Sequence, residues 1–434
     1  MNILFVSEYY PPKVLGGGEL NFASLAQRLT ENSQKVMVLT SFFPGLEQYE
    51  EKDGVKIYRR LKTGASPHGF LSNVQRSLLF PRSIVKEVRK LAQETIIDLI
   101  HFQGTSIIAA PKLKQLNKPL FATIESFPAL CPKGDRLYHG KEECKVVCSL
   151  AQFLPCQAHS PEMGKMKNKW YLKYNLLLLL FIYWHYRRLN KALRHCHLVS
   201  ISKYVQNLLA QHQLQSQAVI PNIIDAEKFY SIMKEKREKN QKPCILYLGA
   251  LIESKGPQIL LAALPGLDCR CDLYGDGVLK EQLQEMIVQK GLDAEIHPLV
   301  SYEQVPRLYA AADIVVYPSL WPEPFGRIPL EAMAAGKLII ASNIGAIPEI
   351  VPAGGILFPT GKVEELRQEL QRQINNKKNN NQKKNLPREE KNKAKKGATT
   401  LADRTYSPDI VVRQWINFYS NPYPIRHQIG KNPK

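Results

Sequence analysis

The stretch WPEPFGRIPLE (321–331) carries two glutamates, Glu323 and Glu331, at a spacing that could serve chemistry. A pair of carboxylates near a pocket is the usual equipment of acid–base catalysis, with one proton donor and one acceptor. Prolines and a glycine disfavour a helix before Arg327, whereas Pro329 suits a first helical turn. The pattern therefore predicts Glu323 in a loop and Glu331 early in a helix, where they would hold different parts of one elongated ligand.

Two further stretches lie where a predicted strand passes into a predicted helix. In PPKVLGGGEL, Gly16 and Gly17 would let backbone N–H groups approach a phosphate at the start of a helix. In LGALIESKG, Lys255 could meet a diphosphate as a point charge. A tight turn and a solvated lysine explain these features equally well, so both interpretations stay open at this point.

Apolar strand segments alternate with amphipathic helical segments along most of the chain. Examples are the strand NILFVSEYY before the helix GGGELNFASLAQRLTENS, and the strand CILYLGAL before the helix QILLAALPGL. Such alternation predicts an α/β fold made of two Rossmann-like, doubly wound domains facing a cleft. We place an N-terminal domain at 1–217 and a C-terminal domain at 218–400, with a helix at 405–422 packing back on the first. Ligands of such sheets bind beyond the carboxyl ends of the strands.

The chain has 434 residues, 44% hydrophobic content and a formal net charge of +20. Part of this charge lies in the apolar-poor run 375–397, which is typical of a solvated stretch. Basic residues also flank LLLLLFIYW (176–184), whose nine apolar residues are far short of the ~20 that span a bilayer. A buried core helix and an interfacial helix on an anionic membrane surface both fit. No helix-turn-helix, zinc-finger or RNP pattern supports a nucleic-acid partner.

The compartment is predicted from the N-terminus and the cysteines. MNILFVS runs directly into a strand without a basic leader, which predicts a cytoplasmic protein, peripheral at the inner face of the cell membrane if the 176–184 helix is interfacial. The eight cysteines are then expected as thiols. Four of them cluster, Cys131, Cys144, Cys148 and Cys156, in a spacing unlike paired C-x2-C zinc sites. Packing thiols are favoured over a metal site or local disulfides.

Taken together, these motifs resemble family 4 of the retaining glycosyltransferases, which has the glycosyltransferase B fold. The E-x7-E signature of that family matches PSLWPEPFGRIPLEAMAAGK, and the order of GGGE, IPNIID, GALIESKG, YGDG, AAADIVVYPS and GAIPEIV also agrees. The resemblance covers most of the chain, with looser agreement at 140–190 and 375–400. It implies a hexosyltransferase that moves a sugar from a nucleotide-diphosphate donor, GDP-mannose or a UDP-hexose, to a glycan or lipid-linked acceptor, as in polysaccharide or cell-envelope biosynthesis.

The resemblance also implies roles for the residues of the E-x7-E stretch. Glu331 would hydrogen-bond the ribose hydroxyls of the donor. Glu323 would lie at the transferred sugar, whose hydroxyls the backbone amides of Phe325 and Gly326 would hold. Glu323 is therefore expected among the catalytic residues.

The diphosphate would be met by other groups. The resemblance assigns it the amide of Leu330 with the start of its helix, the ammonium of Lys255, and the first-domain amides of Gly16 and Gly17 when the cleft closes. Because no D-x-D motif is present, no divalent metal and no cofactor are expected.

Three positions depart from the family pattern. Ala250 stands where an arginine is common, and Gln103 stands where a histidine often faces the sugar; we expect Gln103 to take that catalytic position. On the acceptor side, Glu125 and Ser126 replace a His-Asp pair, and His101 lies nearby along the chain. Ala250 and Gln103 also favour an alternative, a catalytically weak or inactive nucleotide-sugar or glycan-binding protein of the same fold.

Overall fold

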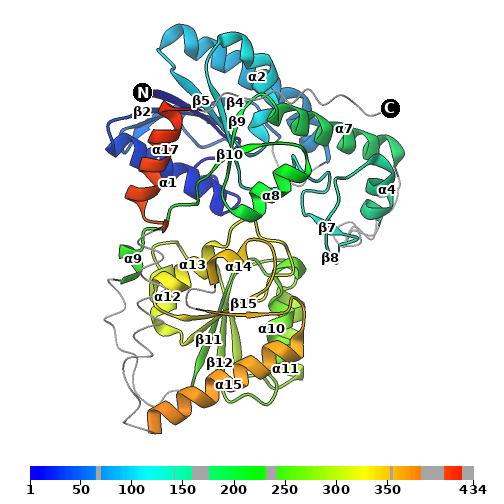
Figure 1. The fold of residues 1–434 in the computed structure, drawn as a ribbon. Helices are drawn as coiled ribbons and strands as arrows, with labels where there is room; N and C mark the ends of the chain where they lie inside the picture. Colours follow the sequence, from blue (N-terminus) through cyan, green and yellow to red (C-terminus); the bar gives the residue numbers. More distant parts are fainter. Residues whose placement is uncertain are drawn as a thin grey trace. The chain divides into compact units, whose positions relative to one another are not determined.

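The computed structural model describes residues 1–64, 70–140, 142–158, 175–230, 242–351, 355–382 and 405–422. The chain divides into two compact units, Met1–Ile223 with Val411–Lys434, and Ile224–Ile410 (Figure 1). The division lies six residues beyond the predicted boundary after Gln217. The predicted limit at 400 lies outside the described residues.

The first unit is built on an eight-stranded sheet in the order β10-β9-β6-β5-β1-β2-β4-β3. All neighbouring strands are parallel except β3 and β4, which form an antiparallel hairpin at one edge. The strands of the first unit, with the separate β7–β8 pair, are β1 (Asn2–Val6), β2 (Lys35–Ser41), β3 (Tyr49–Lys52), β4 (Val55–Leu61), β5 (Leu99–Gln103), β6 (Leu120–Ile124), β7 (Leu137–Tyr138), β8 (Glu142–Glu143), β9 (His197–Ser200) and β10 (Ser216–Val219).

Helices of the first unit connect these strands, as the alternation of segments predicted. They are α1 (Gly17–Glu31), α2 (Phe70–Glu94), the short η1 (Gly104–Ala109), α3 (Ala110–Leu113) and η2 (Lys114–Leu116), α4 (Leu150–Ala158), α7 (Leu176–Leu193), α8 (Lys203–Gln211) and α17 (Pro408–Ser420). α2 continues through Pro81, which lies in its interior. Phe80 and Ile84 are buried on the two sides of this proline, so packing outweighs its helix-breaking tendency.

The C-terminal helix α17 belongs to the first unit, where Figure 1 draws it in red beside α1. Its apolar face, which includes Val411, Trp415 and Tyr419, is buried in one cluster with β1 and α1 residues such as Phe5 and Phe22. Burying this face stabilises the helix far more than its intrinsic propensity does.

The second unit is a six-stranded parallel sheet in the order β13-β12-β11-β14-β15-β16. The strand order reverses direction between β11 and β14, which makes this pair the switch point where ligands of doubly wound sheets bind. The elements are α9 (Glu227–Tyr230), β11 (Cys244–Leu248), η5 (Glu253–Lys255), α10 (Pro257–Ala263), β12 (Arg270–Tyr274), α11 (Lys280–Gln289), β13 (Ala294–His297), α12 (Val305–Ala311), β14 (Ile314–Tyr317), α13 (Arg327–Ala334), β15 (Leu338–Ser342), α14 (Ile347–Ile350), β16 (Gly355–Phe358) and α15 (Val363–Gln382).

Two segments singled out by their composition take definite positions. The first residues of the basic run, 375–382, continue α15, and the rest of that run lies outside the described residues. The apolar stretch 176–184 forms the first half of α7. Among the described helices, none combines the length and apolar character needed to cross a membrane.

A hydrogen bond between Tyr419 and His101 gives a direct test of how α17 contributes to stability. The Tyr419 hydroxyl lies 2.7 Å from Nδ1 of the buried His101 ring. Tyr419→Phe leaves that nitrogen without its partner, and we expect it to cost about 1–3 kcal/mol. Calorimetry should show a melting temperature lower by several degrees. The control Tyr49→Phe removes an exposed hydroxyl and should change little; equal melting temperatures for both variants would contradict the expectation.

Candidate functional site

At the switch point of the second unit, the carboxyl ends of β11 and β14 carry an ion pair. Lys255 ends the short helix η5 after β11, and Glu323 lies in the loop after β14. Lys255 Nζ is 2.6 Å from Oε1 of Glu323, although 68 residues separate them in the sequence. The structure thus brings together two residues that the sequence identified separately.

The Glu323 carboxylate is buried and anchored through one oxygen. Besides Lys255, the hydroxyls of Tyr317 and Ser319 donate to Oε1 at 2.5 and 3.0 Å. Lys255 Nζ also lies 4.2 Å from the centre of the Trp321 ring. No described residue donates a hydrogen bond to Oε2, which leaves that oxygen able to accept from a hydroxyl group. Sequence reasoning missed the anchoring residues, although they stand in the same YPSLWPE stretch.

Close approach of a second loop fixes the backbone at Glu323. The Ala346 N–H donates to the Glu323 carbonyl at 2.8 Å, so the SNIGAIPEIV loop (342–351) contacts the loop that carries Glu323. Gly345 has a φ of +58°, and a Cβ there would lie 2.5 Å from the Glu323 nitrogen and oxygen. Gly326 has a φ of +138°, and a Cβ there would lie 2.7 Å from Ile347 Cδ1. Glycine suits both positions: at Gly345 a side chain would collide with the backbone of Glu323, and at Gly326 the positive φ would strain any other residue.

Glu331 lies one turn into α13 and is 3% exposed. The hydroxyl of Tyr302 donates to Oε1 at 3.0 Å, that of Tyr309 donates to Oε2 at 3.1 Å, and Arg327 Nε donates to Oε1 at 2.7 Å. The Arg327 guanidinium also stacks over the Tyr302 ring, 4.6 Å from its centre. Burial lowers the pKa of Arg327, but the Glu331 charge outweighs it and the net shift is upward. The buried Glu331 carboxylate thus has a cation and two hydroxyl donors in direct contact.

The pairing with Glu331 answers one question raised by the absence of an arginine at position 250. Arg327 forms an ion pair with Glu331, one helical turn away, and does not take the place of the arginine that is common at position 250. The i, i+4 spacing of Arg327 and Glu331 on a helix was a signal that could have predicted this pair. Ala250 itself is exposed in the loop after β11.

Two further residues predicted to bind the donor in this unit, Leu330 and Phe325, make contacts within the fold. The Leu330 N–H, which was expected to face the phosphates, donates to the Gly326 carbonyl at 3.2 Å inside the helix. The first turn of a helix still has N–H groups without intrahelical acceptors. The Phe325 side chain is buried, with its ring edge-on to Tyr406 at 5.8 Å.

In the first unit, Gln103 and Glu125 form a hydrogen-bonded chain at the carboxyl ends of β5 and β6. Ser7 Oγ donates to Gln103 Oε1 at 2.8 Å, and Gln103 Nε2 donates to Glu125 Oε2 at 2.6 Å. Asn21 on α1 donates to the other carboxylate oxygen at 3.0 Å. Burial raises the pKa of Glu125 to about 7, against the lowering effect of these two amide donors and with a further rise from Glu19.

The glycine run lies at the start of α1, as predicted. The Gly16 N–H donates to Glu19 Oε2 at 2.9 Å, so this amide already has a partner, and Gly17 is the first helical residue. A Cβ at Gly18 would lie 2.9 Å from Glu125 Oε2. The third glycine therefore lets the start of α1 approach the Glu125 carboxylate.

His101 does not occupy the acceptor-side position expected for it. Its side chain is fully buried, with one ring nitrogen 2.7 Å from Tyr419 Oη and the other 2.7 Å from Thr123 Oγ1. Its ring also packs edge-on against Phe5 at 5.0 Å. Burial lowers the pKa of His101 to about 3, so the ring is neutral at physiological pH. The ring is buried because α17 covers this strand, which the position of His101 in the sequence does not reveal.

Comparison with known proteins places this geometry in a family. Residues 229–393 match the family model described as Glycosyl transferases group 1, and residues 15–228 match the model described as Glycosyltransferase Family 4. The chain belongs to the glycosyltransferases of the B fold. An uncharacterised glycosyltransferase of Methanocaldococcus jannaschii is 24% identical over 81% of this chain and 83% of its own length. An uncharacterised 42.6 kDa protein in the cps region of Klebsiella pneumoniae is also 24% identical, over 81% and 87%.

Solved structures agree on the fold of this glycosyltransferase. Anabaena HepE in complex with UDP superposes with a TM-score of 0.65 at 20% identity, covering 97% of this chain and all of that one. The sucrose-phosphate synthase of Thermosynechococcus elongatus gives a TM-score of 0.70 at 18% identity, covering 96% and 98%. The similarity of these two structures to this chain agrees with the α/β architecture of two Rossmann-like domains expected from the sequence.

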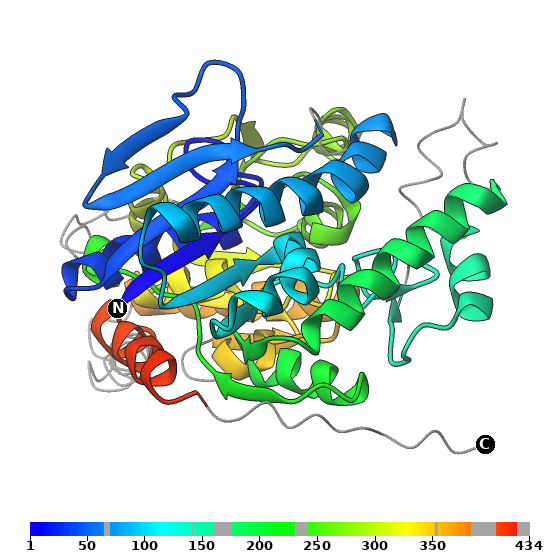
Figure 2. The ribbon, with the colours of Figure 1, turned by 90° about the horizontal axis from the view of Figure 1, so that it is seen from above.

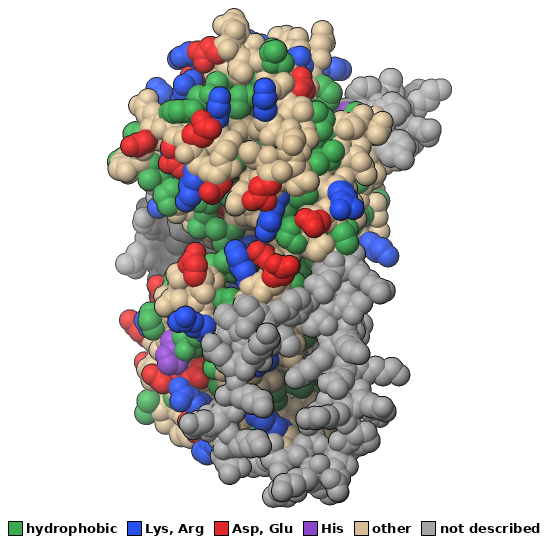
Figure 3. Space-filling view, turned by 90° about the vertical axis from the view of Figure 1, so that its left-hand side faces the viewer, with side chains coloured by type: hydrophobic (Ala, Val, Ile, Leu, Met, Phe, Trp, Pro, Cys, Tyr) green, Lys and Arg blue, Asp and Glu red, His purple; other side chains and the backbone are tan. Residues whose placement is uncertain are grey.

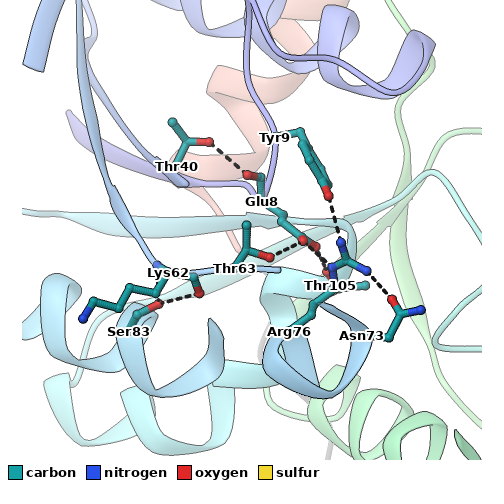
Figure 4. Close-up of polar contacts among 9 residues, drawn as sticks. All are labelled: Glu8, Tyr9, Thr40, Lys62, Thr63, Asn73, Arg76, Ser83 and Thr105. Atoms are coloured by element: carbon teal, nitrogen blue, oxygen red, sulfur yellow. Dashed lines mark hydrogen bonds and ion pairs between the residues drawn. The ribbon is translucent and has the colours of Figure 1, made fainter. Parts of the chain in front are cut away.

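One buried carboxylate of the glycosyltransferase was missed by sequence reasoning. Glu8 follows β1 and is 7% exposed, and Figure 4 shows the side chains that surround it. The hydroxyls of Thr63 and Thr105 donate to Glu8 at 2.6 and 2.9 Å, and Arg76 from α2 forms an ion pair with it. Arg76 Nη2 also donates to the Tyr9 hydroxyl at 2.9 Å. This network connects α2 to the end of β1. In the sequence, the only local indication of it was a charged residue shortly after an apolar strand.

The raised pKa of Glu125 predicts how stability depends on pH. An unfolded glutamate titrates near ~4.3 and the folded one near 7. As pH rises between these values, the unfolded state gains the charge first, so this group lowers the free energy of unfolding across that range. Glu125→Gln should reduce the fall of the unfolding free energy with rising pH, measured by urea titrations at a series of pH values. The exposed-carboxyl control Glu51→Gln should keep the wild-type slope; an unchanged slope in Glu125→Gln would contradict the assignment.

Proposed function

We propose that this glycosyltransferase moves a hexose from a nucleotide-diphosphate donor to a glycan or lipid-linked acceptor, retaining the anomeric configuration and using no divalent metal. The observation that carries the proposal is the pair of buried carboxylates, Glu323 and Glu331, at the switch point of the second sheet. Each is held in place by its own donors, one on a loop and the other on a helix. Carboxylate oxygens accept hydrogen bonds, and a nucleotide sugar offers hydroxyl donors at both ends.

In this proposal Glu331 accepts from the ribose hydroxyls, because its oxygens retain acceptor capacity beyond their three donors. Glu323 Oε2 accepts from a hydroxyl of the transferred sugar, and the N–H groups of Phe325 and Gly326 donate to neighbouring sugar oxygens. Glu323 Oε1 keeps Tyr317 and Ser319 as partners when Lys255 turns to the donor. The two carboxylates thus orient the donor rather than transfer protons.

The diphosphate needs positive charge and N–H donors because it leaves with a growing negative charge. Lys255 is suited to this task, since its ammonium sits at the strand end beside the sugar-binding carboxylate. The start of α13 adds N–H groups and the positive end of the helix dipole. We assign Gly16 and Gly17 to the same task; the Gly16 amide has to exchange its Glu19 partner for a phosphate oxygen.

The proposed reaction is a same-face displacement at the anomeric carbon. The bond from that carbon to the phosphate oxygen breaks with its electron pair going to the nucleoside diphosphate. The acceptor oxygen forms the new bond, and its proton passes to a donor phosphate oxygen. Gln103 and Glu125 are placed by this proposal at the acceptor hydroxyl, which Glu125 can orient as a hydrogen-bond acceptor when ionised. A carboxyl with a pKa of about 7 would make acceptor binding weaken below neutral pH.

Uridine diphosphate is the first nucleotide to test. HepE, which shares the fold, is solved in complexes with UDP and with UDP-glucose. GDP-mannose remains the second donor class. The experiment is a panel of UDP-hexoses and GDP-mannose, with release of nucleoside diphosphate measured in the presence and absence of lipid-linked and free glycan acceptors. Sustained acceptor-dependent release supports a transferase, and NMR of the product's anomeric proton tests retention. Binding without turnover would favour the non-catalytic alternative that Ala250 and Gln103 suggest.

Donor binding through Glu331 yields a mutational prediction. Glu331→Ala removes the acceptor of the ribose hydroxyls, and charge-assisted hydrogen bonds of this kind are worth about 1.5–3 kcal/mol. The donor KM and the calorimetric Kd should therefore both rise by about tenfold or more. Glu285→Ala on the exposed face of α11 serves as a matched control and should bind like the wild type. Unchanged donor affinity in a folded Glu331→Ala protein would exclude the ribose role.

We further propose that the first half of α7 attaches the enzyme to an anionic membrane surface. Leu176, Leu177 and Trp184 are exposed to 56%, 79% and 44%, which a buried core helix would not allow. Figure 2 shows this part of α7 extending outward next to α4. Arg188 lies over the Trp184 ring at 4.5 Å, so cationic and apolar groups share one surface.

Basic side chains of α2 support this surface, because α2 and α7 contact each other through Arg188 Nη1 and the Ser77 carbonyl at 3.4 Å. Arg82, Lys86, Arg89 and Lys90 of α2 line one open groove with Lys112. On the different face drawn in Figure 3, by contrast, basic and acidic side chains of the described residues are interspersed. These basic side chains thus lie on α2 and α3, two helices that contact α7.

Membrane attachment through α7 makes a prediction about vesicles. Vesicles rich in anionic lipid should bind the protein at low salt, and binding should weaken as salt rises. Leu177→Ser should reduce binding severalfold, because it removes an exposed apolar group from the interface. Val288→Ser, at an equally exposed apolar position of α11, should leave it unchanged. Binding that ignores both lipid charge and Leu177→Ser would contradict the proposal.

A further inference from the structure

The chain between β6 and α7 forms a loop-rich insertion with little core of its own. From Phe127 to Ala158 its only regular elements among the described residues are the two-residue strands β7 and β8 and the helix α4. Figure 1 shows these elements together beside α7. Small segments with little regular structure often rely on disulfides or a bound metal for stability.

Four cysteines converge inside this insertion. Cys131, Cys144, Cys148 and Cys156 all line one small cavity, and all four are free thiols. The other four cysteines, which lie elsewhere in the chain, are Cys196, Cys244, Cys269 and Cys271. Chain folding thus gathers one half of the thiols at a single place, over a sequence span of 26 residues.

Hydrogen-bond donors surround two of the sulfur atoms. Burial raises the pKa of the Cys131 thiol, and the main-chain N–H groups of Lys133, Gly134 and Arg136 oppose that rise. The His139 N–H donates to Cys156 Sγ at 3.4 Å. N–H donors around sulfur stabilise a thiolate, which is the form that binds metal, and they are the usual outer partners of metal-bound cysteines.

Positive charge is buried beside the same thiols. The Arg136 side chain is 1% exposed, lines the cavity and has no hydrogen-bond partner at Nε. Its other nitrogens donate to the carbonyls of Val146 and Cys144, and no described carboxylate forms an ion pair with it. The Lys133 side chain is 3% exposed, with Nζ 3.2 Å from Asp135 and 3.7 Å from Cys156 Sγ. The cavity wall therefore carries a buried cation in excess, which is costly unless an anion compensates it.

We propose that Cys131, Cys144, Cys148 and Cys156 bind one zinc ion that holds this insertion together. On binding, four S–H bonds break, four Zn–S bonds form and four protons pass to solvent. The resulting centre of one Zn²⁺ and four thiolates carries a charge of −2, which the excess cation beside it partly balances. Tetrahedral four-cysteine coordination is typical of structural rather than catalytic zinc.

The ion would complete the arrangement of the sulfur atoms. Among the described residues, only Asp272, Glu295 and His297 bring three ligand atoms within 4.8 Å of one another, so the four sulfurs have to close in on the metal. The Asp272 group is the weaker candidate, because Arg270 Nη2 already lies 2.9 Å from Asp272 and 3.5 Å from Glu295. The insertion follows Glu125, so zinc would also fix the chain next to the proposed acceptor-binding carboxylate.

The test uses the full chain, expressed in zinc-supplemented medium and purified without chelators or metal-affinity steps. We expect elemental analysis to find about one zinc per chain, and native mass spectrometry to show the same ion lost on acid denaturation. Cobalt exchange should give thiolate-to-cobalt charge-transfer and tetrahedral d–d absorption. This spectrum reports the ligand set independently of enzymatic activity.

Matched substitutions identify the ligands. Cys148→Ser and Cys144→Ser should lose most of the zinc, whereas Cys196→Ser and Cys269→Ser should retain it. If the ligand variants do not fold, a mercurial thiol reagent titrated into the wild type should release the zinc as four thiols react. Wild-type protein without stoichiometric metal would overturn the proposal. A mass lower by four hydrogens, meaning two disulfides among the four cysteines, would overturn it equally.

Discussion

The burial of two carboxylates away from water is the constraint on which the second unit depends. Glu323 and Glu331 are each almost fully buried, and a buried charge persists only when cations and hydroxyls replace the lost hydration. Lys255, Tyr317 and Ser319 do this for Glu323, while Arg327, Tyr302 and Tyr309 do it for Glu331. Most of the polar side chains at this end of the sheet are thereby fixed before any ligand arrives.

This arrangement gives the site its pre-organisation. Because the loop of Glu323 and the first turn of α13 are locked by Gly345 and Gly326, the carboxylates cannot drift toward each other or into solvent. A site held in this way spends little free energy on ordering when it binds. The first unit follows the same rule with Glu125, whose burial beside Gln103 and Asn21 raises its pKa to about 7 rather than pairing it with a cation. One unit thus holds two carboxylates that are each paired with a cation, and the other holds a carboxyl whose pKa is about 7.

Long-range packing also decides which polar residues remain accessible. α17 returns from the end of the chain and covers β5, so His101 becomes a neutral core residue bonded to Tyr419, whereas Gln103, two residues further on, reaches Glu125 at the strand end. The insertion after β6 likewise gathers four thiols, three from segments without regular structure and one, Cys156, from α4. In each case the decisive contact joins residues far apart in the sequence or in segments without regular structure.

The sequence by itself determined the alternation of strands and helices, the two Rossmann-like domains, the family, and the placement of Glu323 in a loop and Glu331 in a helix beginning at Arg327. These follow from local physics: apolar periodicity, the dihedral limits of proline and glycine, and motifs contiguous in the chain. Only the tertiary structure decided which side chains pair with each other. The Lys255–Glu323 pair spans two strands that meet at the switch point, and the burial of His101 depends on a helix more than 300 residues later. Side-chain partnerships across a fold leave no periodic trace in the sequence, because they depend on which elements become neighbours in space.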